Sequence, residues 1–103
     1  MNLDDYQKIS IQGLAIKNKS VAALAHRSLG LAGEAGAISN AMKKVIRDSD
    51  GQLSEKDKAL LLEKLGDTMF YIVGLADFAG LSMKEIMSTN ADKTKKFIKT
   101  RQI

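Results

Sequence analysis

The sequence predicts an all-α fold of four antiparallel helices joined by short connections. The 103 residues contain no Pro, and Ala, Leu, Lys, Met and Ile are abundant, a composition that favours helix over strand. Apolar residues recur at spacings of three and four in four successive segments. Polar or glycine-containing turns of roughly two to six residues separate these segments, and such short turns favour antiparallel neighbours. The length corresponds to one domain, residues 1–103.

The first two segments are defined by their apolar positions and by polar residues at their ends. The first should begin near Asn2 or Asp4 and end around residues 17–19, and its repeating positions are Leu3, Tyr6, Ile9, Gly13 and Ile16. Ser20 is a suitable N-cap for a long second helix. That helix should end at the turn-rich residues 48–51, and its stripe comprises Val21, Leu24, Ser28, Leu31, Ala35, Ile38, Met42 and Val45.

Capping boxes introduce the third and fourth segments. Residues 54–57, with Ser first and Asp last, form a variant of this motif, and residues 82–85 form the full Ser-x-x-Glu version. Gly80 fits the left-handed position that follows a helix C-terminus. The third helix should carry an apolar stripe of Leu61, Leu65, Met69, Ile72, Leu75 and Ala79.

Charge and Cys content limit the classes of function. The whole excess of +4 lies in residues 90–103, so the chain is not a generally basic nucleic-acid binder, and we expect no nucleic-acid partner. The basic stripe suits a compact anion such as a polyphosphate, or is a solvated helical tail. The absence of Cys excludes a thiolate metal site and suits a reducing cytoplasm. The longest uncharged stretch near the N-terminus has eight residues, so no membrane association is expected.

Glycines interrupt the predicted helices at a cost in helix propensity. They stand at Gly30, Gly33 and Gly36 in the second helix and at Gly66 and Gly74 in the third. Each costs about 0.5–1 kcal/mol relative to Ala. Either the small residues let the helix backbones approach closely, or they keep space open beside a ligand.

Two carboxylates occupy unusual positions within apolar helices. Glu34 lies in the glycine-rich part of the second helix, and Asp67 lies beside the apolar run of the third. A charge in such a position is disfavoured unless it is paired. The pair could coordinate Mg²⁺, which accepts carboxylate and phosphate oxygens. Alternatively, each carboxylate pairs with a lysine such as Lys64 or Lys43.

Several other polar residues are candidates for phosphate binding. Asn90 and Lys93 share one face of the fourth helix at a spacing of three and could hold phosphate oxygens, although such a pair is also ordinary surface chemistry. Lys43 and Lys44 are weaker candidates. His26 is the one histidine and has no ligand or catalytic partner at a suitable spacing.

Together these residues resemble the MazG-like family of all-α nucleoside triphosphate pyrophosphohydrolases. The similarity spans about residues 3–96 and rests on four landmarks in order: residues 3–7 of the opening helix, residues 29–36 followed by Lys43 and Lys44, residues 65–67 followed by Phe70 and Tyr71, and Asn90 with Lys93. The resemblance implies a four-helix bundle that binds Mg²⁺, or Mn²⁺, and cleaves a nucleoside triphosphate to a monophosphate and pyrophosphate. It also implies metal ligation by Glu34 and Asp67, phosphate contacts from Asn90 and Lys93, and a homodimer or homotetramer.

The sequence departs from the family pattern at two of the four ligand positions. Ala37 and Lys64 stand where the family has Glu, so the formal charge of the site falls from −4 to −1. Glu63 could substitute as a displaced metal ligand, because it projects about 40° from Asp67 on the same helix. Two hypotheses therefore remain: a Mg²⁺-dependent pyrophosphohydrolase, and a catalytically degenerate relative that binds nucleotide or serves as an oligomeric interaction module.

Overall fold

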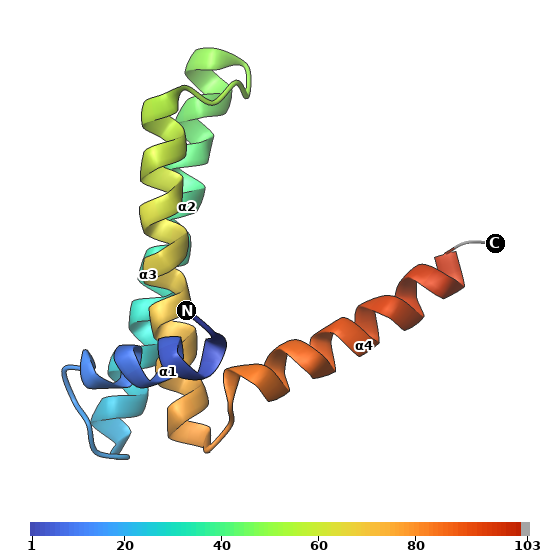
Figure 1. Ribbon diagram of the computed structural model, residues 1–103. Coiled ribbons are helices and arrows are strands. Elements are labelled where there is room, and N and C mark those ends of the chain that lie inside the picture. The colour runs from blue at the N-terminus through green and yellow to red at the C-terminus, as the bar shows by residue number, and fades with distance from the viewer. Residues whose placement is uncertain (102–103) are drawn as a thin grey trace.

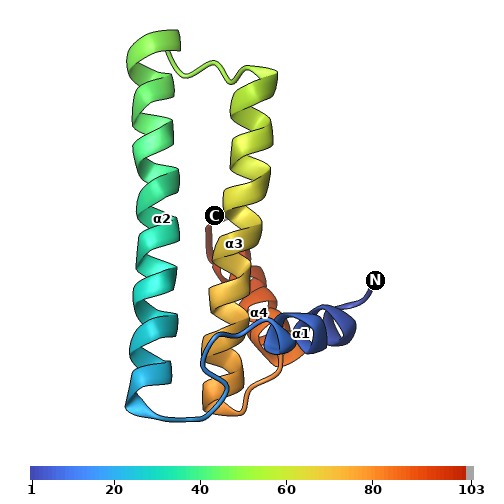
Figure 2. The ribbon, with the colours of Figure 1, turned by 90° about the vertical axis from the view of Figure 1, so that its left-hand side faces the viewer.

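The computed structural model describes residues 1–101 and contains four α-helices over that range, with no strand. They are α1 (Leu3–Gln12), α2 (Val21–Ser49), α3 (Glu55–Ala79) and α4 (Met83–Arg101) (Figure 1). The long helices α2 and α3 run antiparallel, side by side, as a hairpin (Figure 2). The predicted all-α class and the four helices are confirmed.

The predicted helix ends are formed by the expected side chains. Ser54 and Asp57 bond reciprocally to each other's backbone N–H at the start of α3. Ser82 and Glu85 do the same at the start of α4, with distances of 3.0 and 3.1 Å. Gly80 adopts the left-handed conformation after α3, at φ 71°. These local signals fix where α3 begins and ends and where α4 begins.

The first helix is shorter than the periodicity predicts. It ends at Gln12 rather than around residues 17–19, and an irregular segment leads to α2. This segment buries Leu14, which is 5% exposed, and leaves the carbonyl of Ile16 free to accept a hydrogen bond from Arg27 at 3.0 Å. Tertiary contacts have therefore overridden the helical pattern.

The core lies at the end of the hairpin where α1 packs against α3 and α4. Val73, Ala76 and Met83 are its buried centre, and partly buried apolar residues of α1, α3 and α4 pack around them. Away from this end, α2 and α3 continue as a two-helix pair, and α4 projects outward (Figure 1). The Cα radius of gyration is accordingly large, 16.5 Å.

Candidate functional site

The helix glycines fall into two groups. A Cβ on Gly30 would lie 2.3 Å from the ring of Tyr71, and a Cβ on Gly74 would lie 3.2 Å from the side chain of Arg27. No atom lies within 4 Å of the corresponding position at Gly33, Gly36 or Gly66. Close helix approach therefore explains Gly30 and Gly74, while the other three glycines leave open space.

The two candidate carboxylates converge on one ammonium group. Lys64 Nζ on α3 lies 3.4 Å from Glu34 Oε2 on α2 and 3.8 Å from Asp67 Oδ2, one turn along α3. Side-chain exposures are 29% for Lys64, 24% for Glu34 and 45% for Asp67, so the cluster is half-buried. The structure brings Glu34 and Asp67 together, and it places a lysine between them.

The charge environment favours the protonated form of this lysine. The hydrogen bond from Lys64 to Glu34, and the charge of Glu34, raise the pKa of the Lys64 ammonium above its usual value. Partial burial opposes this rise, and Asp67 and Glu63 add smaller favourable contributions to it. Lys64 is therefore a stable cation within the cluster throughout the physiological range of pH.

Glu63 is the third acidic candidate, beside Glu34 and Asp67. Glu63 is exposed on α3 and contributes to the field at Lys64. No set of three or more Asp, Glu or His side chains within residues 1–101 lies close enough together to hold a metal ion. The role of Glu63 as a displaced metal ligand stays a prediction.

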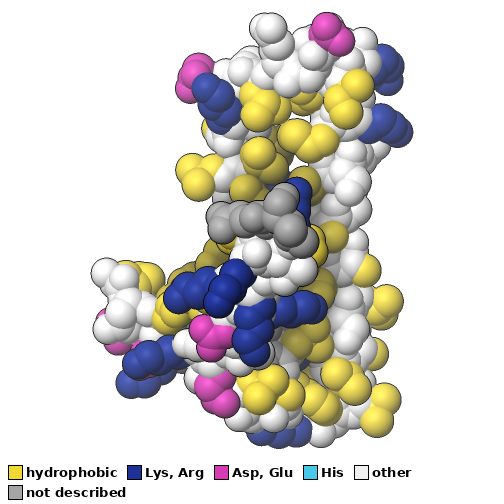
Figure 3. Space-filling model, turned by 90° about the vertical axis from the view of Figure 1, so that its right-hand side faces the viewer, with side chains coloured by type: hydrophobic (Ala, Val, Ile, Leu, Met, Phe, Trp, Pro, Cys, Tyr) yellow, Lys and Arg dark blue, Asp and Glu magenta, His cyan; other side chains and the backbone are white. Residues whose placement is uncertain are grey.

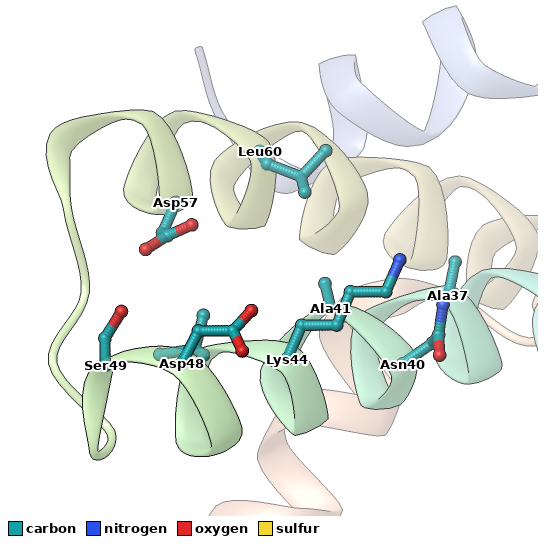
Figure 4. A pocket seen from close by; sticks show the side chains of 9 residues that line it. Ala37, Asn40, Ala41, Lys44, Asp48, Ser49, Asp57 and Leu60 are labelled. Carbon is teal, nitrogen blue, oxygen red and sulfur yellow. The ribbon is translucent and has the colours of Figure 1, made fainter.

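A groove of about 350 Å³ continues along α2 and α3 from Ala37 towards the connecting loop. Ala37 lies one helical turn after Glu34, and the side chains of Lys44, Asp48 and Asp57 point into the space between the two helices (Figure 4). Asn40 lines the same groove, whereas Lys43 is exposed outside it. The groove thus combines apolar side chains with charged side chains of both signs.

Asn90 and Lys93 lie elsewhere in the molecule. Both are exposed on α4, where they line a shallow, largely apolar depression with Leu81 and Ile86. Because α4 projects away from the hairpin, one chain does not bring these two residues to the Glu34–Lys64–Asp67 cluster (Figure 1). His26 lies beside Tyr71, with ring centroids 6.2 Å apart.

Sequence reasoning missed the most buried charged residue of the chain, Arg27. Its side chain is 1% exposed and donates to the carbonyl oxygens of Gly74 at 2.7 Å and Ile16 at 3.0 Å. It also pairs with Asp77 at 3.3 Å. Arg27 stands one position before Ser28, which is the polar member of the predicted apolar stripe of α2, and nothing else in the local pattern distinguishes Arg27. It fixes α2, α3 and the segment after α1 to one another.

Within residues 1–101, no helix combines the length and the apolar character that crossing a membrane requires.

Comparison with known proteins finds a relative from a phage. The chain is 35% identical over 74 residues to the Gene 37 protein of Mycobacterium phage L5, and the match covers 72% of this chain and 65% of that protein. The chain thus spans less than two thirds of the length of this relative, whose name states no activity. No protein-family model matches the sequence. No solved structure matches it either. The resemblance to the MazG-like pyrophosphohydrolases stays a prediction based on the motifs.

Proposed function

We propose that the chain is a non-catalytic relative of the MazG-like pyrophosphohydrolases, a helical module that acts by binding a partner rather than by turnover. The observation that carries this proposal is the position of Lys64, whose ammonium lies within 4 Å of the carboxylates of both Glu34 and Asp67.

The absence of Cys suits the cytoplasm, where we place the protein.

The physical reason is that Mg²⁺ and the ammonium of Lys64 would compete for the same position beside the carboxylates of Glu34 and Asp67. Mg²⁺ is held in proteins by carboxylates that it approaches to about 2.1 Å. An ion bound by Glu34 and Asp67 would therefore lie against the ammonium of Lys64, and like charges at such short range repel strongly. Ala37 offers no oxygen in compensation. The residues present do not fit the metal that the resemblance implies, and the ammonium of Lys64 offsets one of the two carboxylate charges instead.

A second candidate function is Mg²⁺-dependent pyrophosphohydrolysis of a nucleoside triphosphate. One observation favours it: Glu34 and Asp67 come from different helices and approach the same point, as carboxylates of a metal site must. This function would require Lys64 to turn away from both carboxylates. It would also require Asn90 and Lys93 to reach the cluster from another copy or after a movement of α4.

The test is an assay of pyrophosphate release with each NTP and dNTP in the presence of Mg²⁺ or Mn²⁺. We expect no release by the wild type above that of Glu34→Ala, because the cation position is filled. The double variant Ala37→Glu/Lys64→Glu restores four carboxylates and should gain release. Lys58→Glu makes the charge change of the Lys64→Glu component at an exposed position of α3 and is the control for that substitution. Turnover by the wild type that Glu34→Ala abolishes would overturn the proposal.

A further inference from the structure

Helix α4 is anchored to the rest of the chain through its first turn. Met83 is buried in the core, and Ile86 packs against it. The side-chain amide of Gln7 on α1 fixes the turn that precedes α4. Its Nε2 donates to the Leu81 carbonyl at 3.1 Å, and its Oε1 accepts from the backbone N–H of Met83 at 3.0 Å. Every residue from 87 to 101 is exposed, so most of α4 is presented to solvent in a direction that its start determines.

The side chains of α4 are segregated by polarity and charge. At about 100° per residue, one arc of about 120° holds five apolar side chains, which are Met83, Ile86, Met87, Phe97 and Ile98. Lys84 and Lys95 border this arc on one side and Lys93 borders it on the other, whereas Glu85 and Asp92 lie on the opposite side of the helix. Figure 3 shows Lys and Arg side chains gathered around α4, which points towards the viewer. Such a helix suits a partner that is both apolar and acidic.

The depression on α4 adds a concave feature to this helix. It has a volume of about 350 Å³, and its lining residues are Leu81, Glu85, Ile86, Thr89, Asn90 and Lys93. The carboxylate of Glu85 is engaged at the start of α4, where it accepts from the backbone N–H of Ser82 at 3.1 Å. The side chain of Lys93 supplies the positive charge at the other end of the depression. An apolar side chain of a partner could therefore enter beside a lysine.

The depression belongs to a longer face of α4. Ile86, Asn90, Lys93 and Phe97 follow one another at spacings of four, three and four, so their side chains share one face. We call these four residues the docking face. At its far end Phe97 is 58% exposed, and the guanidinium of Arg101 lies 5.1 Å from the centre of its ring.

The extent of the positive charge favours an extended partner over a compact anion. Helix α4 has six basic and two acidic residues and holds the whole net charge of +4. From Lys84 to Arg101 the basic residues extend over about 25 Å along the helix axis. A compact anion reaches a few of them, whereas an acidic segment of a protein can lie beside all of them.

Polar residues within the apolar arc favour a protein over a lipid surface. Asn90 and Thr94 lie near the centre of the arc, and burying an amide without a hydrogen bond is costly. A protein can supply that bond and can place a side chain in the depression, which a flat bilayer does not do. A second copy of this chain lacks the required charge, because residues 1–82 contain ten basic and ten acidic residues and its α4 is itself cationic.

We propose that α4 is the docking surface for an acidic amphipathic helix of a partner protein. The partner helix lies along the docking face, inserts an apolar side chain into the depression and brings carboxylates to Lys93 and Lys96. Side chains at spacings of three and four are the usual anchors between an amphipathic helix and the surface that receives it. This partner gives a chemical class to the interaction module of the proposed function, on which the inference rests.

The test is the binding of a fluorescently labelled synthetic peptide to the full chain, measured by anisotropy at neutral pH. A peptide of about eighteen residues, with Leu at spacings of three and four and Glu elsewhere, supplies an acidic amphipathic helix. One control peptide has Lys in place of Glu, and another has the same composition in scrambled order. We expect the first peptide to bind most tightly. Its dissociation constant should rise at least about tenfold between about 0.05 M and 0.5 M salt, because screening weakens the contacts between charges.

Two substitutions on the docking face separate the apolar and charged contributions. Phe97→Ala should raise the dissociation constant at least about tenfold, because an aromatic anchor is lost. Leu62→Ala truncates a side chain that is 76% exposed on α3 and is the matched control. Lys93→Glu should raise the dissociation constant at least about fivefold, whereas Lys43→Glu makes the same charge change at an exposed position of α2 and should have little effect. Circular dichroism checks that each variant is folded.

Several outcomes would overturn the inference. They are the absence of binding to the acidic peptide, binding that Phe97→Ala and Lys93→Glu leave unchanged, and displacement of the peptide by stoichiometric triphosphate. Binding to vesicles of phosphatidylcholine and phosphatidylserine that Phe97→Ala weakens would also overturn it, because α4 would then be a membrane contact. Pyrophosphate release by the wild type that Glu34→Ala abolishes would instead overturn only the proposed function, since peptide binding and turnover are measured separately.

Discussion

Two charged contacts join α2 to α3, and they differ in almost every physical respect. Arg27, at the end of the hairpin where the core lies, is 1% exposed and has three hydrogen-bond acceptors, of which two are backbone carbonyls. Lys64, in the middle of the hairpin, is 29% exposed and faces two carboxylates. The first contact is buried, and the second is half-exposed and lies one helical turn from the groove between α2 and α3.

The difference separates the part of the molecule that holds the fold from the part whose chemistry can change. Removing a buried charge leaves its partners without solvent or hydrogen bonds, which is strongly destabilising. A half-exposed cluster can exchange a lysine for a glutamate because water still reaches the carboxylates. We therefore expect substitutions at Glu34, Lys64 and Asp67 to leave the fold intact.

The largest expected effect comes from Arg27. Arg27→Met retains much of the apolar stem but removes the ion pair with Asp77 and leaves the carbonyls of Ile16 and Gly74 without this donor. We expect a loss of about 3 kcal/mol in the free energy of unfolding, measured by urea denaturation at one protein concentration. The control is Arg47→Met, since the Arg47–Asp48 pair is exposed. Equal losses of stability in both variants would show that the buried Arg27 contact contributes no more than an exposed ion pair.

The glycines give a second and smaller contrast. Gly30→Ala would drive a methyl group into the ring of Tyr71 and should cost about 1–3 kcal/mol. Gly36→Ala meets no atom within 4 Å and should stabilise the same helix by about 0.5–1 kcal/mol. Thermal unfolding of the two variants measures both effects. A stabilising Gly30→Ala would show that α2 and α3 do not approach closely there.

A third effect concerns the start of α3. Ser54→Ala removes the hydrogen bond from the backbone N–H of Asp57 and should cost about 1 kcal/mol of stability. Ser88→Ala, at an exposed position inside α4, should be neutral or slightly stabilising because Ala has the higher helix propensity. Thermal unfolding provides the comparison, and a neutral Ser54→Ala would contradict the capping role.

The smallest effect is the pH dependence of the Lys64 contact. Because the pKa of Lys64 is raised in the folded chain, its stabilisation is fully present below the unfolded pKa of about 10.4 and disappears as pH rises through the folded value. The melting temperature of the wild type should therefore exceed that of Lys64→Met at pH 8, and the difference should shrink above pH 10.5. A difference that is independent of pH would show that the ammonium does not act through its charge.

Local signals predicted most of the fold. The caps at Ser20, Ser54, Ser82 and Gly80 specify helix ends through bonds made within a few residues, so they could be identified without tertiary information. The end of α1 could not, because it depends on the burial of Leu14 in the folded chain.

The candidate site was predictable only in part, and for a similar reason. The positions of Glu34 and Asp67 in apolar parts of two helices, and the motifs around them, indicated that they could meet, and the lysine alternative named Lys64 correctly. Spacing along α4 could not indicate that this helix diverges, which leaves Asn90 and Lys93 away from the cluster. Arg27 gave no usable signal, since its role depends on two carbonyls that are distant in sequence.

The central claim is that the ammonium of Lys64 fills the position a divalent cation would need. The most direct test is the melting temperature of the wild type, Lys58→Glu and Ala37→Glu/Lys64→Glu with and without Mg²⁺. We predict no Mg²⁺-dependent change for the first two proteins. The double variant should rise by at least about 4 °C, the shift that 1 kcal/mol of binding to the folded state produces in a domain of this size. A wild type that Mg²⁺ stabilises as much as the double variant would contradict the claim.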